Sequence, residues 1–177
     1  MTRRQKASVP CANVALDAET RVTADHHQSL RVWLRMLACT NLIGNHVRQR
    51  LQAQFSTTLP RFDLMAQLER APQGLKMGEL TRRLMVTGGN VTGITDMLEE
   101  EGLVTRATDP QDQRAFRVKL TEAGAQQFRR MAQEHERWVV ELFDDLTEKQ
   151  KSRLAELLAA LKMSTAQRVV ATGGPRS

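Results

Sequence analysis

The sequence predicts a mainly α-helical protein with one small β-hairpin. Aromatic residues make up only 4% of the 177 residues and tyrosine is absent. The core is therefore expected to consist of Leu, Val, Met and Ala, which favours helix packing. Apolar residues recur at helical spacing over most of residues 30–161, whereas residues 103–120 alternate on both sides of a polar loop. These observations predict helices that flank a hairpin.

Composition limits the functional classes. Lys and Arg number 26 against 20 Asp and Glu, a formal net charge of +6, which fits a polyanionic partner without requiring one. The two cysteines, Cys11 and Cys39, are too far apart for a disulfide framework or a zinc cage. We find no signal peptide, membrane span, Gly-rich phosphate loop, Cys/His metal spacing or nucleophile motif. We therefore expect a cytoplasmic protein that is not an enzyme and has no cofactor, metal or membrane association.

The first helix is predicted within residues 25–56, after a flexible N-terminal arm at residues 1–24 that lacks apolar periodicity. A free cysteine on an apolar helix face is usually a core residue, and we expect this of Cys39. The sequence leaves open whether this cysteine has a redox role. The apolar stripe consists of Leu30, Trp33, Leu34, Leu37, Val47 and Leu51, and is broadened by Met36, Cys39 and Ile43.

Two short helices are predicted next. Thr57, Thr58 and Pro60 are typical of a helix start, and Pro72 with Gly74 ends this second helix. Its apolar residues are Phe62, Leu64, Met65 and Leu68. A third helix is predicted at residues 77–84, where Lys76 offers no side-chain cap and Glu79 is left to support the first turn.

A fourth helix and the hairpin follow. The helix is expected at residues 87–101, with Thr87 as N-cap and Gly102 as C-terminal stop. Residues 103–107 and 115–120 are the predicted strands of the hairpin. In the second strand, alternation places Phe116, Val118 and Leu120 toward the core and leaves Ala115, Arg117 and Lys119 on an opposite, basic face.

Two helices are predicted to complete the fold. Thr121 begins a long helix, and Thr147 with Gln150 forms a capping box for the last one. His135 lies on the apolar stripe of the long helix, so it is interpreted as a core or interface residue. A flexible tail is expected at residues 166–177.

Three sequence segments are characteristic when they occur together at this spacing. They are Asp109-Pro110-Gln111-Asp112-Gln113-Arg114, the run from Val118 through Leu120-Thr121 to Gly124, and the run from Val91-Thr92 through Leu98-Glu99 to Gly102-Leu103-Val104. Together they resemble the MarR family of bacterial transcription regulators. The resemblance covers roughly residues 29–162. It implies a winged helix-turn-helix at residues 57–121, flanked by dimerisation helices at residues 25–56 and 122–165, in an obligate homodimer with a triangular outline.

In a helix-turn-helix the second helix enters the major groove of DNA and its N-terminal residues contact base edges. Here these residues are Thr87, Gly88, Gly89, Asn90, Thr92 and Gly93. Asn90 has the donor and acceptor that pair with adenine, although it could instead cap its own helix. Asp96 and Glu99 lie later in the helix and should point away from the phosphates.

Cations of the wing and of the third helix are the remaining candidates for DNA contacts. Arg114 is expected to enter the minor groove, where the negative potential is enhanced, and Asp112 would orient it. A purely structural role, in which Asp112 and Arg114 only fasten the hairpin, is the alternative. Arg82, Arg83, Arg106, Arg117 and Lys119 are candidate phosphate contacts, of which some will simply be solvated.

A candidate effector site lies around the first helix, which has no acidic residue between Ser29 and Leu59. Basic and apolar residues there could line a crevice for an anionic, partly aromatic ligand, such as an aromatic acid or its coenzyme A thioester. The candidates are Trp33, Arg35, Met36, Ile43, His46, Arg50, Phe62 and Met65. The alternative is that the arginines pair with carboxylates of the fifth helix, at Glu134, Glu136, Glu141, Asp144 and Asp145.

These expectations combine into one functional hypothesis. The protein is expected to be a homodimeric repressor that binds a palindromic DNA operator and releases it when a small anionic aromatic effector binds. The alternative is a ligand-independent, architectural or adaptor DNA-binding protein.

Overall fold

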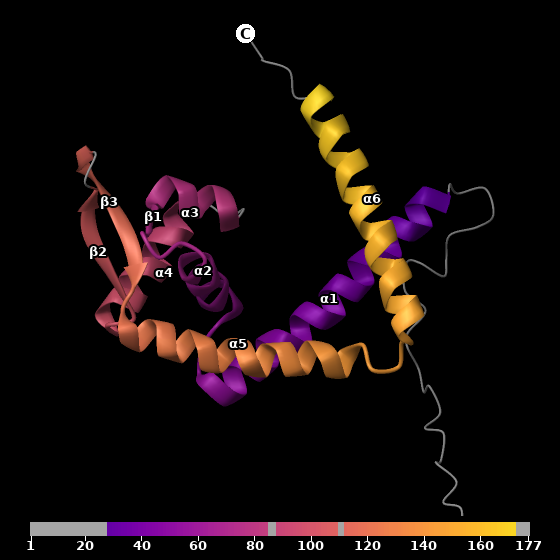
Figure 1. The fold of residues 1–177 in the computed structure, drawn as a ribbon, viewed down its shortest axis with the longest axis horizontal. Helices are drawn as coiled ribbons and strands as arrows, with labels where there is room; N and C mark the ends of the chain where they lie inside the picture. The colour runs from indigo at the N-terminus through magenta and orange to yellow at the C-terminus, as the bar shows by residue number, and fades with distance from the viewer. Residues whose placement is uncertain (1–27, 85–87, 110–111, 173–177) are drawn as a thin grey trace, which may run out of the picture. The chain divides into compact units, whose positions relative to one another are not determined.

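The computed structural model describes residues 28–84, 88–109 and 112–172 (Figure 1). The elements are α1 (Gln28–Phe55), α2 (Leu59–Glu69), β1 (Leu75–Lys76), α3 (Met77–Leu84), α4 (Gly88–Glu100), β2 (Val104–Asp109), β3 (Asp112–Leu120), α5 (Glu122–Leu142) and α6 (Glu148–Thr172). The predicted fold class, mainly α with a small β-hairpin, is confirmed. The chain divides into two compact units, Met1–His46 and Val47–Ser177, with the boundary inside α1. Each unit is described by itself.

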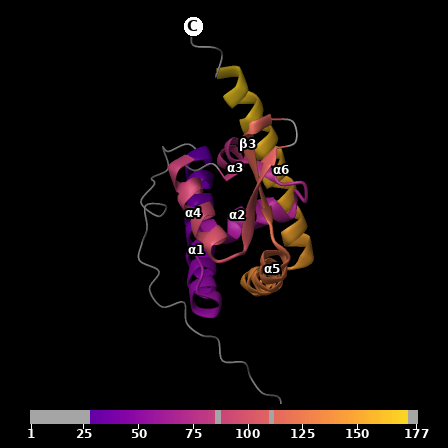
Figure 2. The same cartoon turned by 90° about the vertical axis from the view of Figure 1, so that its left-hand side faces the viewer.

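The second unit is built on a three-stranded antiparallel sheet in the order β1-β3-β2. Val118 of β3 pairs with Leu75 of β1 on one side and with Arg106 of β2 on the other. The sheet contacts α2, α3 and α4 (Figures 1 and 2). Figure 1 also shows α5 leading away from the end of β3.

The core of the second unit is formed by the apolar faces of these elements. Its apolar residues with at most 2% exposure are Leu51, Leu64, Met65, Leu68, Leu80, Val91, Leu98, Val104, Val118, Met131 and Trp138. The indole of Trp138 on α5 contacts the ring of Phe55 at the end of α1, with ring centroids 6.3 Å apart. The last turns of α1 therefore belong to this core.

Three of the predicted signals at helix ends are present, whereas Thr58, the N-cap of α2, makes no side-chain capping hydrogen bond. The amide of Thr147 donates to Gln150 Oε1 at 2.8 Å, and the amide of Gln150 donates to Thr147 Oγ1 at 3.3 Å, which confirms the capping box. The carboxylate of Glu79 accepts from the amide of Lys76 at 2.9 Å, so Glu79 supports the start of α3. Gly102 ends α4 with φ of +70°, a conformation that glycine adopts without steric cost.

The Leu120-Thr121-x-x-Gly124 segment joins the wing to α5 by close contacts. Thr121 Oγ1 donates to the carbonyl of Gly102 at 2.7 Å and accepts from the amide of Gly124 at 3.0 Å. A Cβ atom on Gly124 would lie 1.9 Å from the carbonyl oxygen of Leu103. Only glycine allows α5 to begin this close to the first residue of the wing.

The wing differs from prediction in two respects. β1 was not predicted, because two residues are too short for a periodic pattern. Phe116 is 53% exposed, so its predicted core position is wrong. The alternation does hold for Val118, which is fully buried. β1 pairs only with Arg117 and Val118, so Phe116 extends past the part of β3 that is covered by this neighbour.

Two further predictions are corrected outside the wing. α6 continues to Thr172, so residues 166–172 are not a loose tail. Ala, Gln and Arg in this segment favour helix, and the first glycine comes only at Gly173. Cys39 is exposed, because the part of α1 in the first unit is a single helix without a packed core of its own. The predicted arm at residues 1–24 lies outside the described residues.

Among the described helices, none has both the length and the apolar character needed to cross a membrane.

Candidate nucleic-acid interface

α3 and α4 form the helix-turn-helix, and one face of α4 is buried in the domain. Val91, Ile94 and Leu98 are at most 5% exposed and follow the i, i+3, i+7 spacing of a buried helix stripe. Between these buried positions lies an outward edge with no charged side chain. We call this edge the reading edge; it consists of Gly89, Asn90, Thr92 and Gly93, all of them exposed.

The two glycines of the reading edge have open space in front of them. A Cβ atom on Gly89 or Gly93 would meet no heavy atom within 4 Å. Packing within the chain therefore does not require glycine here, and the effect of glycine is a flat surface over which a partner can approach closely. α4 begins at Gly88, so Asn90 lies inside the first turn and not before it. Thr87, the predicted N-cap, lies outside the described residues.

Arg82 and Arg83 occupy the last turn of α3, immediately before the connection to α4. Both side chains are exposed. The Nε of Arg82 donates to the carbonyl of Gly78 at 3.3 Å, a long bond that leaves most of the guanidinium available. Their predicted contacts with phosphate stay a prediction.

The second half of α4 is fastened to the wing. The guanidinium of Arg106 on β2 forms ion pairs with both Asp96 and Glu99, and its amide donates to Glu99 at 3.1 Å. The hydrogen bond to Asp96 is the main cause that raises the pKa of Arg106. The two carboxylates thus face the wing, and Arg106, expected among the phosphate contacts, is engaged inside the domain.

The wing changes register near its tip. Thr108 pairs with Phe116, but the next pair is Asp109 with Asp112. Three residues of β3, at positions 113–115, therefore have no counterpart on β2. Such a bulge bends a strand and redirects the residues that it contains. Arg114 lies inside this bulge; the side chains of Asp112 and Arg114 lie outside the described part of the structure, so their predicted roles stay predictions.

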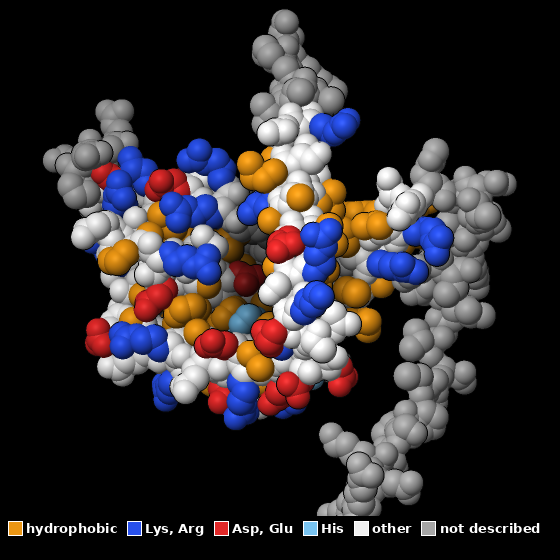
Figure 3. Space-filling model, turned by 45° about the vertical axis from the view of Figure 1, so that its right-hand side comes forward, with side chains coloured by type: hydrophobic (Ala, Val, Ile, Leu, Met, Phe, Trp, Pro, Cys, Tyr) orange, Lys and Arg blue, Asp and Glu red, His pale blue; other side chains and the backbone are white. Residues whose placement is uncertain are grey.

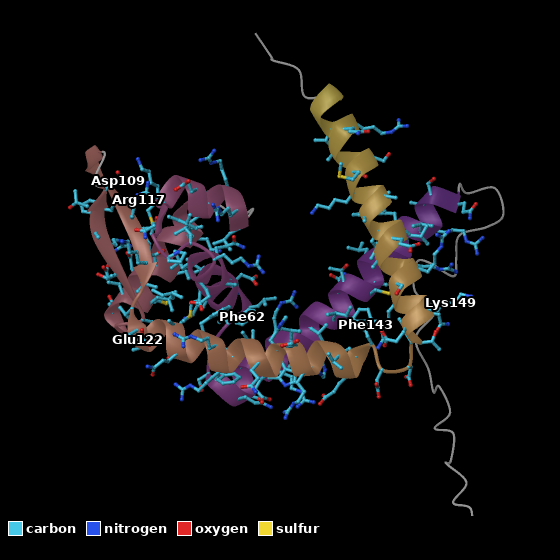
Figure 4. All side chains as sticks on the ribbon, in the orientation of Figure 1. Phe62, Asp109, Arg117, Glu122, Phe143 and Lys149 are labelled. Carbon is cyan, nitrogen blue, oxygen red and sulfur yellow. The ribbon has the colours of Figure 1, made fainter. Side chains whose placement is uncertain are left out.

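A buried carboxylate lies at the base of the bulge. The side chain of Asp109 is 0% exposed, and its Oδ2 is 2.7 Å from Arg117 Nε and 3.2 Å from Lys76 Nζ. Arg117 Nη1 also donates to the carbonyl of Gly74 at 3.2 Å. We call Gly74, Lys76, Asp109 and Arg117 the wing base. Figure 4 shows Asp109 and Arg117 next to each other at the hairpin.

The wing base corrects one expectation and adds residues that the sequence did not indicate. Arg117 was expected on an open basic face, but its Nε is directed at Asp109, and its contact with phosphate stays untested. Sequence reasoning missed Asp109 and Lys76, because an Asp-Pro pair is an ordinary turn signal. Alternation along the strand gave no signal either, because it would place Val104 and Asp109 on opposite faces, whereas both are buried.

The candidate effector residues are divided between the two units. In the first unit Trp33 is 56% exposed and Arg35 is exposed, whereas Met36, Ile43 and His46 are half-buried. In the second unit Arg50 is half-buried, and Phe62 and Met65 are core residues with 6% and 1% exposure. Five of the eight candidates thus lie in the first unit and three in the second.

The surroundings of Phe62 contain two titratable groups. The ring of Phe62 lies 4.9 Å from the ring of His135 and 5.4 Å from that of Phe128, measured between centroids. His135 is thus a half-buried packing residue, as predicted. Desolvation raises the pKa of the neighbouring Asp63, and the charge of His135 opposes this effect. Of the five carboxylates named as possible partners of α1, Glu134 and Glu141 contact Arg137 of their own helix.

Comparisons with known proteins identify the same architecture. A sequence profile described as MarR family matches residues 57–116. An uncharacterised HTH-type transcriptional regulator from Bacillus cereus is 31% identical over 128 residues, which cover 72% of this chain and 84% of the relative.

Two solved structures extend the comparison. A MarR family transcriptional regulator from Silicibacter pomeroyi is 32% identical, with a TM-score of 0.69 over 81% of this chain and 99% of that chain. A MarR family transcriptional regulator from Streptomyces coelicolor, solved in complex with DNA, is 28% identical, with a TM-score of 0.66 over 88% of this chain and 91% of that chain. The helix-turn-helix with its exposed edge, the hairpin wing and these likenesses agree, and the chain belongs to the MarR family of DNA-binding transcriptional regulators.

Proposed function

We propose that the protein is a homodimeric repressor that binds a palindromic operator and releases it when a small anionic aromatic ligand binds. The observation that carries the DNA-binding part is the reading edge, an exposed and uncharged helix edge beside the exposed Arg82 and Arg83. Uncharged polar groups at the start of a recognition helix read base edges, while neighbouring cations contact phosphates.

Dimerisation is supported by an apolar stripe on α6. Leu154, Leu157, Leu158 and Leu161 recur at helical spacing and are 40–52% exposed. Hydrophobic side chains are visible on this helix in Figure 3. Exposed stripes of this kind mark protein interfaces, and a second copy of the chain is the partner that a palindromic operator requires. Sedimentation of the purified protein at micromolar concentration tests this part, and a monomer would contradict it.

The proposed mechanism of release is geometric. Two recognition helices must lie about 34–36 Å apart to reach half-sites one helical turn apart. A ligand that binds more tightly to a dimer with another spacing shifts the population away from the DNA-binding form. The ligand needs no contact with DNA for this effect.

 The ligand class is proposed from the charge of α1. This helix contains four arginines, Arg31, Arg35, Arg48 and Arg50, and no acidic residue. An excess of cations beside apolar side chains suits an anionic, partly aromatic ligand. Trp33, which is 56% exposed, offers an aromatic surface on the same helix.

A ligand screen tests this part. Benzoate, salicylate and benzoyl-coenzyme A are added to the purified protein, and its thermal unfolding and its binding to a selected DNA duplex are measured. Binding to the native state raises the melting temperature, and the proposal expects the same compound to weaken DNA binding. If DNA binding is retained but none of the anionic aromatic compounds has either effect, a ligand-independent architectural protein is the better description.

DNA binding itself is tested without knowledge of the operator. The wild-type protein selects duplexes from a random-sequence pool, and the enriched sequence is footprinted. The proposal expects a palindrome whose half-sites are about one helical turn apart. Enrichment of no sequence above the starting pool would contradict it.

A further inference from the structure

We infer that Asp109 is the positioning residue of the wing: its buried carboxylate, held by Arg117 and Lys76, fixes the bulge that carries Arg114. This inference rests on the proposed DNA binding by the wing. It assigns to Arg117 and Lys76 a role inside the protein, where they hold Asp109 in place.

The position of Asp109 in the hairpin is the first support. Asp109 is the last residue of β2 and lies where the register shifts. Its pairing with Asp112 closes one end of the bulge, and the pair formed by Thr108 and Phe116 closes the other. The direction in which the bulge projects therefore depends on where Asp109 is held.

The contacts of Asp109 link three segments of the chain. Arg117 lies on β3 and Lys76 on β1, and both approach the same carboxylate oxygen, at 2.7 and 3.2 Å. Arg117 also binds the carbonyl of Gly74, in the turn before β1, at 3.2 Å. The end of β2 is thus tied to the central strand and, through it, to the edge strand next to α3.

The turn at Gly74 is packed closely against β3, which restricts movement of the turn along this strand. A Cβ atom on Gly74 would lie 2.7 Å from the carbonyl oxygen of Val118 and 2.6 Å from Lys119 Cγ. The backbone of the turn is therefore pressed against β3. Gly74 also has φ of +79°, which makes a side chain there unfavourable for a second reason.

Burial distinguishes this cluster from the other ion pairs of the domain. The side chain of Asp109 is 0% exposed, whereas Asp96 and Glu101, which also pair with arginines, are 49% and 47% exposed. A buried ion pair contributes little net stability compared with apolar residues, but a single charge left without its partner is strongly unfavourable. The cluster therefore acts mainly by excluding other conformations of the hairpin.

The test is a double-mutant cycle with Asp109→Asn and Arg114→Ala. The probe is the duplex that the wild-type protein selects from a random pool, and affinity is measured at several salt concentrations. We expect each single variant to weaken binding by about tenfold. In the Arg114→Ala background, Asp109→Asn should add less than about twofold, because both changes remove the same contact. The salt dependence of binding should fall by the same amount in both single variants.

A matched control and a second variant separate positioning from stability. Glu101→Gln removes a carboxylate from an arginine pair outside the wing, and its DNA affinity should equal that of the wild type. If Asp109→Asn fails to fold, Asp109→Asn combined with Arg117→Gln removes both charges of the closest pair. Loss of both partners is tolerated better than loss of one. This variant should fold and still bind DNA about tenfold more weakly than the wild type.

The possible outcomes separate a failure of the inference about Asp109 from a failure of the proposed function. If the wild-type protein enriches no duplex, DNA binding by the proposed site fails. If the wild type binds and Arg114→Ala weakens binding while folded Asp109→Asn does not, the inference about Asp109 is overturned. Independent, additive losses in the cycle would overturn it as well, because they would show that Asp109 does not act through Arg114.

Discussion

The reading edge and the wing base use similar residues for opposite purposes. Both contain glycine, but Gly93 faces open space, whereas Gly74 is pressed against the backbone of β3. Both contain polar side chains, but Asn90 is exposed, whereas Asp109 is buried between two cations. One region leaves a surface available to a partner, and the other restricts the conformation of the chain. A residue type therefore indicates its role only together with its surroundings.

The largest expected effect comes from a glycine that is crowded like Gly74. Gly124→Ala places a Cβ atom 1.9 Å from the carbonyl oxygen of Leu103 in the present geometry, so α5 and the wing must separate. We expect a loss of about 3 kcal/mol in the free energy of unfolding, measured by urea denaturation. A variant as stable as the wild type would show that the junction adjusts easily and that crowding does not define this region.

The next effect concerns the polar side chain of the reading edge. Asn90→Ala should reduce discrimination at one base pair by about 1–3 kcal/mol, if Asn90 pairs with adenine. The measurement compares the affinities of the variant and the wild type for duplexes that differ at each position of the selected half-site. If Asn90 instead caps α4, the variant should lose thermal stability and keep its base preference.

A smaller change in the free energy of unfolding, and one that stabilises the protein, is expected at Gly93, which faces open space. Gly93→Ala should stabilise the protein by about 0.5–1 kcal/mol, because alanine is the better residue inside a helix and its Cβ meets no atom within 4 Å. The same variant should bind DNA more weakly, since the methyl group obstructs close approach. Unchanged DNA affinity, measured by titration at fixed salt, would remove Gly93 from the reading edge.

The smallest effect lies outside both regions, at Asp63 on α2. Desolvation raises its pKa in the folded state, so the ionised carboxylate opposes folding above that pKa and this unfavourable effect disappears as the pH falls below it. Asp63→Asn should therefore raise the melting temperature slightly at about pH 7, and the difference should shrink toward about pH 4. A variant that melts below the wild type at about pH 7 would show that the attraction to His135 outweighs desolvation.

Local signals in the sequence determined the helices, their caps and the wing. The capping box at Thr147, the stop at Gly102 and the support of α3 by Glu79 are present as predicted. These features depend on neighbouring residues and on helical periodicity, which a sequence contains directly. The exposed reading edge on α4 followed from the same periodicity, since its buried face is regular.

Tertiary structure alone decided the pairing of charges and the irregular part of the wing. Asp109, Lys76 and Arg117 come from three strands, and no periodic pattern indicates that they meet. The bulge around Arg114 and the exposure of Phe116 depend on register and on the length of β1, both of which are set by contacts between strands. Sequence periodicity fixes which face of an element is buried, but the partner of a buried charge depends on the packing of distant segments.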